Sequence, residues 1–547
     1  MEYPSNFIKT IIENDLKNKK HEHIITRFPP EPNGFLHIGH ARAIITNFEL
    51  ATCFNGKTNL RYDDTNPEKE DTIYVKSILE DIRWLGYEPD EVLFASSYFD
   101  IMYEKALLLI RKNLAFVCEL PAEKIKETRG NITKPGIESP YRNRSVEENL
   151  ELFNNMYLGK YKEGQCVLRA KIDMSSPNMN MRDPVIYRIS YESHHHTGEK
   201  YCIYPMYDYA HPLEDAIEGI THSLCSLEFE DHRPLYDWVV LNCEMPLVPR
   251  QIEFGRLGIE GTIMSKRYLR YLVESNLVDG WDDPRMPTIS GMRRRGYTKE
   301  GIKEFIFNSG LSKINSTVHI GMLEHYIREN LKLVTKRVMG VINPLKIVIT
   351  NYDRKKVEQI NLIYNQDNET LGSRNISFSN ELYIERDDFC IEKPDAKYKR
   401  LSLGDEVRLF GAYFIKANDV EYDENGEVSV VYATYDEKTL SGSGFNERKP
   451  NGTIHYVDAK NCVKAQFNLY GALLDDNVDQ SLDLIDRLNK NSLTIKEGYL
   501  EASLISFNSY DKYQLMRLGY FQVDPDSLKS QKIILNETVG LKSSYKP

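Results

Sequence analysis

Hydrophobic and polar positions follow different periods along this chain. Between residues 5 and 20, apolar side chains recur at helical spacing, which predicts an amphipathic helix. Between residues 24 and 86, short apolar runs alternate with helical stretches. Beyond Pro344, apolar and polar positions alternate with a period of two, as in half-buried strands. The pattern therefore predicts an α/β part followed by a β-rich part.

The first hundred residues are expected to form a doubly wound, Rossmann-like parallel sheet. One buried strand ends at residues 24–25 and the next covers 58–62, with helices over 41–48 and 73–86. Asp63 follows the second strand directly. In open α/β sheets, ligands bind beyond the carboxyl ends of the strands. Asp63 is therefore a candidate ligand-binding residue.

Later changes in the pattern divide the rest of the chain. Residues 98–204 mix helices, strands and a loop-rich stretch, which indicates a domain inserted into the nucleotide-binding fold. Helix and strand alternate again from 205, and 281–337 is expected to be all-helical. We predict a catalytic domain in two halves, residues 1–97 and 205–258, with an inserted α/β domain over 98–204. A lysine loop and helical subdomain follow over 259–335, and C-terminal barrels over 336–547.

The last third is predicted to form two antiparallel β-barrels. The Asn-Gly pair within Asp423–Gly426 is a strong hairpin signal. The strands are expected over residues 345–352, 406–416, 428–435, 452–457, 464–470, 493–499 and 532–536.

Composition narrows the class of protein. A chain of 547 residues is too long for one core. The net charge of −11 argues against an indiscriminate nucleic-acid coat, although local basic surfaces still allow an RNA partner. The eight cysteines are scattered, which fits a reducing compartment and gives no structural zinc site. With no run near the ~20 apolar residues that span a bilayer, we expect a cytoplasmic protein without membrane contact.

Three consecutive histidines, His194 to His196, raise the question of a metal site. Adjacent residues point in different directions on a strand or turn, so we interpret the triplet as a loop of solvated histidines. No metal ligand is predicted in the chain.

The most informative stretch is Arg27–Arg42, RFPPEPNGFLHIGHAR. Its prolines and Gly34 force a turn between a strand and a helix, which points the helix N-terminus and its positive dipole end at a phosphate. His37 and His40 are three residues apart and face the same side. The stretch closely resembles the nucleotide-binding motif of class I aminoacyl-tRNA synthetases, in the form used by the glutamyl/glutaminyl branch.

Two further stretches, residues 202–229 and 281–297, are similar to the bacterial glutaminyl members of this branch, and the similarity extends over essentially the whole chain. It implies ATP-dependent ligation of L-glutamine to tRNA(Gln) through a glutaminyl-adenylate, with transfer to the 2′-hydroxyl of the terminal adenosine. ATP, Mg²⁺ and a monomer are implied too. The inserted domain would bind the acceptor stem and the barrels the anticodon.

A second nucleotide-binding element is expected at Thr262–Arg267, about 225 residues after the first motif. It resembles the lysine loop of class I synthetases, but Ile263 and Arg267 stand where a lysine and a serine are usual. Lys266 alone is then expected to neutralise the departing pyrophosphate. The resemblance assigns catalysis to His37, His40 and Lys266, and ATP contacts to Glu31, Pro32, Asn33, His37, Gly39, His40, Ala41, Arg42, Ala43, Ser226, Arg256, Leu257, Met264, Ser265 and Lys266.

The glutamine pocket is assigned by the same resemblance. Asp63 matches the partner of the α-amino group, and Tyr207, His211, Arg27 and Gln251 surround the side chain. A site for a neutral amide should present no free cation, because glutamate would use one. Arg27 must therefore be neutralised by a neighbour, for which the sequence offers Asp208 or Asp215.

Contacts with tRNA are assigned to five positions. Asp231 resembles the residue that reads the acceptor-stem minor groove, where a carboxylate can accept from the guanine amine. A capping or ion-pairing Asp is an equal alternative. Arg293–Arg295 is either a phosphate patch or a helix-end cluster. Anticodon contacts are assigned to Arg337, Lys399, Arg400 and Thr538, each of which could equally serve the barrel surface.

Three other functions remain alternatives. A glutamate–tRNA ligase has the same chemistry, but residues 204–211 and the β-rich last third oppose it. A small-molecule nucleotidyltransferase would not need the barrels. A catalytically dead tRNA-binding paralogue would not need His37, His40, Asp63 and Lys266 together.

Overall fold

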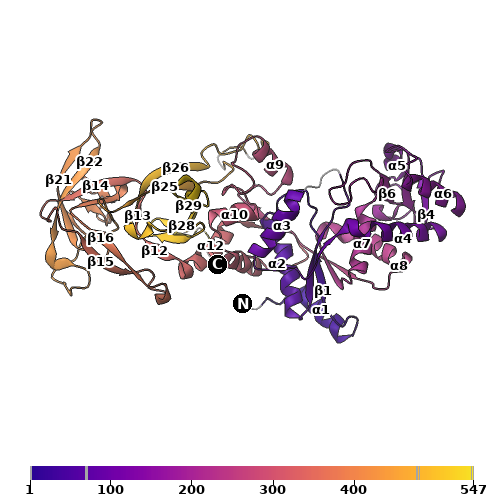
Figure 1. Ribbon diagram of the computed structural model, residues 1–547, viewed down its shortest axis with the longest axis horizontal. Helices are drawn as coiled ribbons and strands as arrows, with labels where there is room; N and C mark the ends of the chain where they lie inside the picture. The colour runs from indigo at the N-terminus through magenta and orange to yellow at the C-terminus, as the bar shows by residue number, and fades with distance from the viewer. Residues whose placement is uncertain (1–2, 68–71, 476–477, 480, 544, 546–547) are drawn as a thin grey trace. The chain divides into compact units, whose positions relative to one another are not determined.

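The computed structural model describes residues 3–67, 72–475, 478–479, 481–543 and 545 (Figure 1). The chain forms two compact units, residues 1–258 with 306–318 and residues 259–305 with 319–547. In the described residues, no helix has both the length and the apolar character needed to cross a membrane.

The first unit is built on a parallel sheet, as the strand and helix pattern predicts. One ladder contains β1, β2 and β3, and a second contains β8 and β9. They adjoin where Thr221 N donates to Ile25 O at 2.9 Å, so the strand order is β3-β2-β1-β8-β9. The order reverses between β1 and β8, where open α/β sheets bind their ligands. The strands are β1 (Ile25–Phe28), β2 (Lys57–Tyr62), β3 (Val92–Phe94), β8 (His222–Ser226) and β9 (Arg250–Phe254).

Helices connect and cover these strands. They are α1 (Phe7–Lys17), α2 (Ile38–Cys53), α3 (Thr72–Trp84), α7 (Tyr207–Ile217) and α8 (Arg233–Asn242). One prediction is wrong in register, because the first strand begins at Ile25 instead of ending there. The apolar pair marks only the start of the strand. Arg27 continues it because its charge is balanced inside the fold, as described below.

The inserted segment forms an antiparallel four-stranded sheet with its own helices. The elements are β4 (Ala115–Cys118), β5 (Val167–Ala170), β6 (Val185–Ile189), β7 (Ile203–Pro205), α4 (Phe99–Arg111), α5 (Ala122–Thr128) and α6 (Val146–Tyr157). The loop between β6 and β7 carries the histidine triplet. The prediction of solvated histidines is wrong for His194 and His195, whose side chains are 0% and 9% exposed because they bond to Asp64.

The helical segment that follows is interrupted by strands. Its helices are α9 (Lys266–Glu274), α10 (Ile289–Arg295), α11 (Lys299–Asn308) and α12 (Ile320–Val334). The strand β11 (Ser316–His319) lies within the range predicted to be all-helical, and β12 (Lys336–Val338) begins at its end. Both are short, and the helical pattern hid them, because β11 lies between α11 and α12 and β12 directly follows α12.

Two seven-stranded sheets form the C-terminal part of the second unit, with orders β12-β27-β28-β29-β25-β26-β13 and β23-β20-β21-β22-β14-β17-β24. The prediction of purely antiparallel barrels needs correction, because each sheet contains two parallel pairs. Read in these orders, both sheets show the same succession of parallel and antiparallel pairs. Parallel pairing joins strands that are distant in sequence, which a local period cannot reveal.

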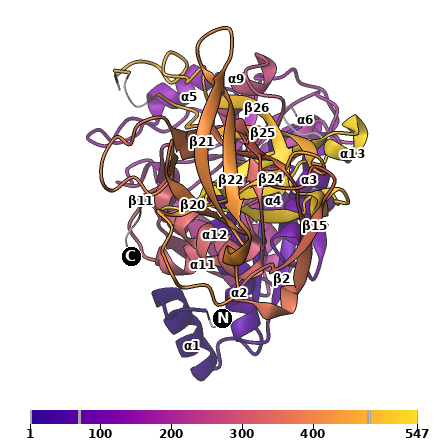
Figure 2. The same cartoon turned by 90° about the vertical axis from the view of Figure 1, so that its left-hand side faces the viewer.

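The strand bounds confirm most of the period-two segments. The first sheet has β12, β13 (Gly340–Val341), β25 (Val463–Tyr470), β26 (Leu493–Leu500), β27 (Lys512–Leu515), β28 (Gly519–Val523) and β29 (Ile533–Gly540). The second has β14 (Pro344–Ile349), β17 (Glu381–Glu385), β20 (Glu406–Leu409), β21 (Phe414–Tyr422), β22 (Val428–Asp436), β23 (Thr453–Ile454) and β24 (Val457–Asp458). Residues 406–416, predicted as one strand, instead form β20 and the start of β21. The Asp423–Gly426 turn closes the β21–β22 hairpin, which Figure 2 shows as a long ribbon.

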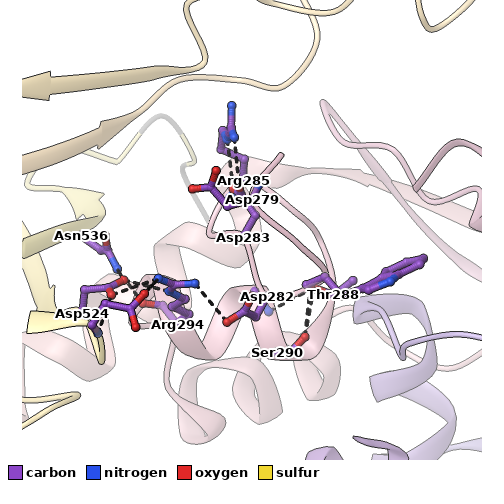
Figure 3. A network of polar contacts seen from close by, with 12 residues as sticks. Asp279, Asp282, Asp283, Arg285, Thr288, Ser290, Arg294, Asp524 and Asn536 are labelled. Atoms are coloured by element: carbon purple, nitrogen blue, oxygen red, sulfur yellow. Dashed lines mark hydrogen bonds and ion pairs between the residues drawn. The ribbon is translucent and has the colours of Figure 1, made fainter. Parts of the chain in front are cut away.

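The C-terminal end of α10 is held by a polar network with strands β28 and β29 (Figure 3). Arg294 pairs with Asp282 at 3.1 Å, Asp524 at 2.9 Å and Asp526 at 2.7 Å. Asn536 donates to the carbonyl of Arg294 at 3.2 Å and to Asp524 Oδ2 at 2.6 Å. Of the two interpretations of the arginine cluster, this network favours a helix-end cluster, because Arg294 is already paired.

Candidate functional site

His37 and His40 lie at the N-terminal end of α2. His37 is the N-cap residue, and its Nδ1 accepts from Gly39 N at 3.1 Å. His40 Nδ1 accepts from His37 N at 3.1 Å, so the two side chains satisfy backbone donors reciprocally. In each neutral ring the proton therefore lies on Nε2, which becomes a donor. Two imidazole donors and a helix N-terminus together suit a polyphosphate.

Other residues of the motif have different tasks. Glu31 accepts from the Asn33 amide within the turn. Arg42 is 2% exposed, and its guanidinium donates to Gly310 O and to Ser316 Oγ. Arg42 thus anchors α2 to residues 306–318. This placement does not support the assignment of its side chain to ATP.

Arg27 is completely buried on β1 and is neutralised by Asp215, not by Asp208. Arg27 Nε donates to Asp215 Oδ1 at 3.1 Å, and Asp208 instead pairs with His232. The remaining Arg27 donors reach Leu224 O at 2.7 Å and Ser223 Oγ at 2.6 Å. The guanidinium is therefore held on several sides and its charge is balanced within the fold.

Asp215 also pairs with Arg61 of β2. Arg61 is not among the site residues predicted from the sequence. Arg61 Nη2 lies 2.9 Å from Asp215 Oδ1, and the same guanidinium pairs with Glu214 at 2.9 Å and Glu218 at 2.8 Å. Burial alone would raise the pKa of Asp215, but Arg27 and Arg61 hold it well below its usual range. An arginine between Leu60 and Tyr62 in a strand predicted to be buried was the available signal, because such a charge needs a partner.

His211 lies between the two guanidinium groups. Its Nε2 is 3.0 Å from Arg27 Nη2 and its Nδ1 is 3.2 Å from Arg61 Nη2. Burial lowers the pKa of His211 to about 3, and the two arginines oppose a third positive charge. The Tyr207 ring stacks on this neutral imidazole, with centroids 5.1 Å apart. The predicted pair Tyr207 and His211 is thus brought together.

Asp63 follows β2 in a buried turn. It is 5% exposed, its N donates to Pro30 O at 3.0 Å, and its Oδ1 accepts from Thr65 Oγ1 at 2.9 Å. Burial raises the pKa of Asp63 to about 6. An ammonium group placed beside it would restore the charged form, which suits the α-amino group of an amino acid.

The ends of β8 and β9 carry further assigned residues. Gln251 donates from its amide to Phe229 O at 3.1 Å and to Glu253 Oε1 at 2.9 Å. Ser226 Oγ donates to Glu228 Oε1 at 2.8 Å, and Glu228 also pairs with Arg256. Ser226 and Arg256 therefore share one carboxylate at the strand end, whereas Leu257 is buried at the start of β10 (Leu257–Glu260).

The lysine segment belongs to the second unit. Ser265 is the N-cap of α9 and Lys266 its first residue, both exposed. A lysine there adds its charge to the positive end of the helix dipole, which suits an anion. Ile263, which departs from the usual lysine, is 3% exposed and packs with Leu269 and Leu473. An apolar side chain is required at this position.

The residues assigned to tRNA differ in exposure. Asp231 is exposed, and its backbone carbonyl accepts from Asn178 at 2.7 Å. Lys399 is exposed, and Arg400 donates to Asp387 O at 2.7 Å. Arg337 donates to Gln514 Oε1 at 3.0 Å and pairs with Asp367. These four assignments stay predictions.

Thr538 is different from the other four. It is 1% exposed, and its hydroxyl donates to Arg295 O at 2.8 Å at the end of α10. Its side chain joins β29 to that helix, so this placement does not support a contact between Thr538 and RNA.

Family comparisons cover most of the chain. The family described as "tRNA synthetases class I (E and Q), catalytic domain" matches residues 23–333. Two families described as "tRNA synthetases class I (E and Q), anti-codon binding domain" match residues 335–436 and 453–524.

Individual relatives match over the whole length. The glutamine–tRNA ligase of Clostridium perfringens is 59% identical, over 100% of this chain and 99% of its own. That of Clostridioides difficile is 56% identical, over 99% and 98%. The solved glutamate tRNA ligase of Elizabethkingia meningosepticum matches at a TM-score of 0.42 with 16% identity, over 56% of this chain and 70% of that one.

Proposed function

The chain belongs to the class I tRNA synthetases of the E and Q type, and we propose that its reaction is ATP-dependent ligation of L-glutamine to tRNA(Gln). The glutamine carboxylate attacks the α-phosphate of ATP, giving glutaminyl-adenylate and pyrophosphate. The 2′-hydroxyl of the terminal adenosine then attacks the activated carbonyl and AMP leaves. The observation that carries this function is 59% identity over the full chain to a glutamine–tRNA ligase.

Neither step needs a nucleophile from the enzyme, so catalysis consists of positioning and charge stabilisation. His37 and His40 donate from Nε2 to the phosphates of ATP. Lys266 supplies the charge that offsets the departing pyrophosphate. Mg²⁺ bound to the nucleotide would neutralise part of the phosphate charge.

Selection of glutamine over glutamate depends on the balanced charges around Arg27. Asp215 offsets the guanidinium, and His211 remains neutral because burial lowers its pKa to about 3. Among the described residues, the groups around Arg27 therefore present polar atoms but no unbalanced cation to the end of the substrate. A glutamate carboxylate would lose its water there without gaining an unpaired positive partner.

The tRNA side of the proposal rests on charged side chains, of which Asp231, Lys399 and Arg400 are exposed and Arg337 is partly buried. Asp231 accepts from the acceptor-stem minor groove, while Lys399 and Arg400, with Arg337, face the anticodon bases. We further propose that one copy of the chain acts alone, as the resemblance implies, and that the protein is cytoplasmic. Sedimentation of the protein with and without tRNA tests the monomer.

Charging of tRNA(Gln) with labelled glutamine or glutamate tests the function directly. Glutamine is expected to be the preferred substrate by kcat/KM, and a preference for glutamate would refute the proposal. Pyrophosphate exchange with glutamine, run with and without tRNA, then shows whether activation waits for tRNA, as the resemblance implies. Exchange and adenylate transfer to a small molecule in the absence of any tRNA acceptor would instead favour a nucleotidyltransferase.

A further inference from the structure

The turn that follows β2 is held by the loop between β6 and β7. His194 Nε2 lies 2.6 Å from Asp64 O, and His195 Nε2 lies 3.2 Å from Asp64 Oδ2. From a third direction, Ser96 donates from its backbone N to Asp64 Oδ1 at 2.8 Å and from its hydroxyl to Oδ2 at 2.6 Å. Asp64 is completely buried. Its position is therefore defined by three residues from two parts of the first unit, the β6–β7 loop and the segment after β3.

The hydrogen bonds of His194 define its tautomer. Nδ1 accepts from His196 N and from Thr197 N, each at 3.1 Å. In a neutral ring the proton then lies on Nε2, which donates to Asp64 O. The loop itself closes through paired backbone bonds between His194 and Gly198, at 3.0 and 2.8 Å. The His194 imidazole thus accepts hydrogen bonds within the β6–β7 loop and donates one to the turn after β2.

A metal site is the competing interpretation of the same residues. Asp64, His194 and His195 each place a possible ligand atom within 4.8 Å of the others. A histidine ligand must direct a nitrogen lone pair at the ion. The single lone pair of neutral His194 already accepts two backbone N–H groups. The geometry therefore favours a hydrogen-bonded clamp.

A second contact ties the same turn to the inserted sheet. Arg188 of β6 donates to Asn66 Oδ1 at 2.8 Å. Asp63 lies in this turn, between β2 and Asp64, and adjacent Cα atoms are about 3.8 Å apart. A shift of the Asp64 backbone is therefore coupled to the position of Asp63, the carboxylate assigned to the α-amino group of the substrate.

We propose that His194 and His195 are positioning residues, which hold Asp63 where it receives the α-amino group of glutamine. The inference rests on the proposed function. In this proposal each histidine acts through its bond to Asp64 and not through a contact with the substrate. A displacement of about 1 Å at a reacting or binding group can cost about two orders of magnitude in rate, so even a partly released turn should be measurable.

Two matched variants of His194 separate its hydrogen bond to Asp64 from its hydrogen bonds within the β6–β7 loop. In His194→Gln the amide nitrogen can reach the place of Nε2 and still donate to Asp64 O. In His194→Asn the side-chain oxygen can replace Nδ1 and still close the loop, but the donor to Asp64 is lost. In tRNA charging, we expect H194N to raise the KM for glutamine about ten-fold and H194Q about two-fold or less. The KM for ATP should stay within about two-fold of wild type in both.

A second pair and a control complete the experiment. His195→Ala should raise the KM for glutamine, and His195→Gln should keep that KM close to the wild-type value. If circular dichroism shows that H194N does not fold, the comparison of these two variants tests the proposal. His23→Asn, at an exposed histidine of the same unit, should change nothing. An unchanged glutamine KM in H194N and H195A, or equal effects of Asn and Gln at 194, would overturn the proposal. So would Zn²⁺ recovered at one equivalent per chain, whose removal raises that KM. Failure of the wild type to charge glutamine would refute the proposed function instead.

Discussion

Arg27 and Asp215 are 188 positions apart in sequence, yet Arg27 Nε donates to Asp215 Oδ1 at 3.1 Å with both side chains fully buried. The same carboxylate accepts from Arg61 of the neighbouring strand at 2.9 Å and from Tyr236 Oη at 2.9 Å. One aspartate therefore balances cations from two strands at the proposed glutamine pocket. Its removal would leave buried charge without a partner.

Asp215→Asn should lower the free energy of unfolding by about 3–5 kcal/mol, because two buried guanidinium groups lose a shared counterion. Urea unfolding at pH 7 measures this loss. The pKa of Asp215 lies below its unfolded value, so its stabilisation is present above about pH 4 and disappears as the pH falls towards the folded pKa. Asp208→Asn, at a half-buried partner of His232, should cost about 1 kcal/mol or less. Equal small losses in both variants would contradict the shared-counterion role.

Glutamine binding should weaken in acid. Burial raises the pKa of Asp63 to about 6, so below that pH the carboxyl becomes neutral and no longer pairs with the substrate ammonium. The KM for glutamine should therefore rise as the pH falls from 7 to 5. The KM for ATP should rise less over the same range. Asp63→Asn should raise the glutamine KM at every pH and flatten its pH dependence. A wild-type KM that is constant over this range would argue against Asp63 as the amino-group partner.

His40→Ala and Lys266→Ala should each slow adenylate formation by about 10²–10³-fold, because each removes charge stabilisation from the transition state. Pyrophosphate exchange measures the rate, and circular dichroism checks that the variants fold. Lys17→Ala, at an exposed residue in the last turn of α1, is the matched control. Near-normal exchange in H40A or K266A would remove that residue from the catalytic set.

Lys399→Ala and Arg400→Ala should each weaken tRNA binding and reduce its dependence on salt concentration. Binding releases fewer counterions from the RNA when one cationic contact is lost. Filter binding at two salt concentrations gives the affinity and the slope. The KM for ATP should not change. If tRNA affinity equals that of the wild type, these residues lie outside the interface.

Gly296→Ala should destabilise the second unit by about 2 kcal/mol or more. Gly296 ends α10 with φ of 109°, a conformation that costs about 1–2 kcal/mol with a side chain. An added Cβ would also come within 2.2 Å of Thr538 Oγ1 and 2.9 Å of Gln522 Cβ. Thermal unfolding measures the loss. Gly426→Ala, in the exposed hairpin turn with φ of 81° and open space around it, isolates the backbone contribution and should cost less.

Predictions from the sequence succeeded where the cause is local. Proline and glycine within Arg27–Arg42 dictate a turn between a strand and a helix, and the helix expected over 41–48 is α2, which begins earlier, at Ile38. The Asn-Gly turn likewise closes β21 on β22. Predictions failed where distant partners decide. The histidine triplet was expected to be solvated because nothing near it in sequence shows that Asp64 would bury it.

The sequence by itself determined the kind of chemistry, because the phosphate-facing helix entrance and the lysine segment depend on short runs of residues and their spacing. Only the tertiary structure decided how the charges are balanced and how Asp63 is held. A buried ion is tolerated only beside a partner, and Asp215 and His194 reach their partners through folding, across 188 and 130 positions. Such distances leave no periodic trace in the chain, so the electrostatics of the pocket became visible only in three dimensions.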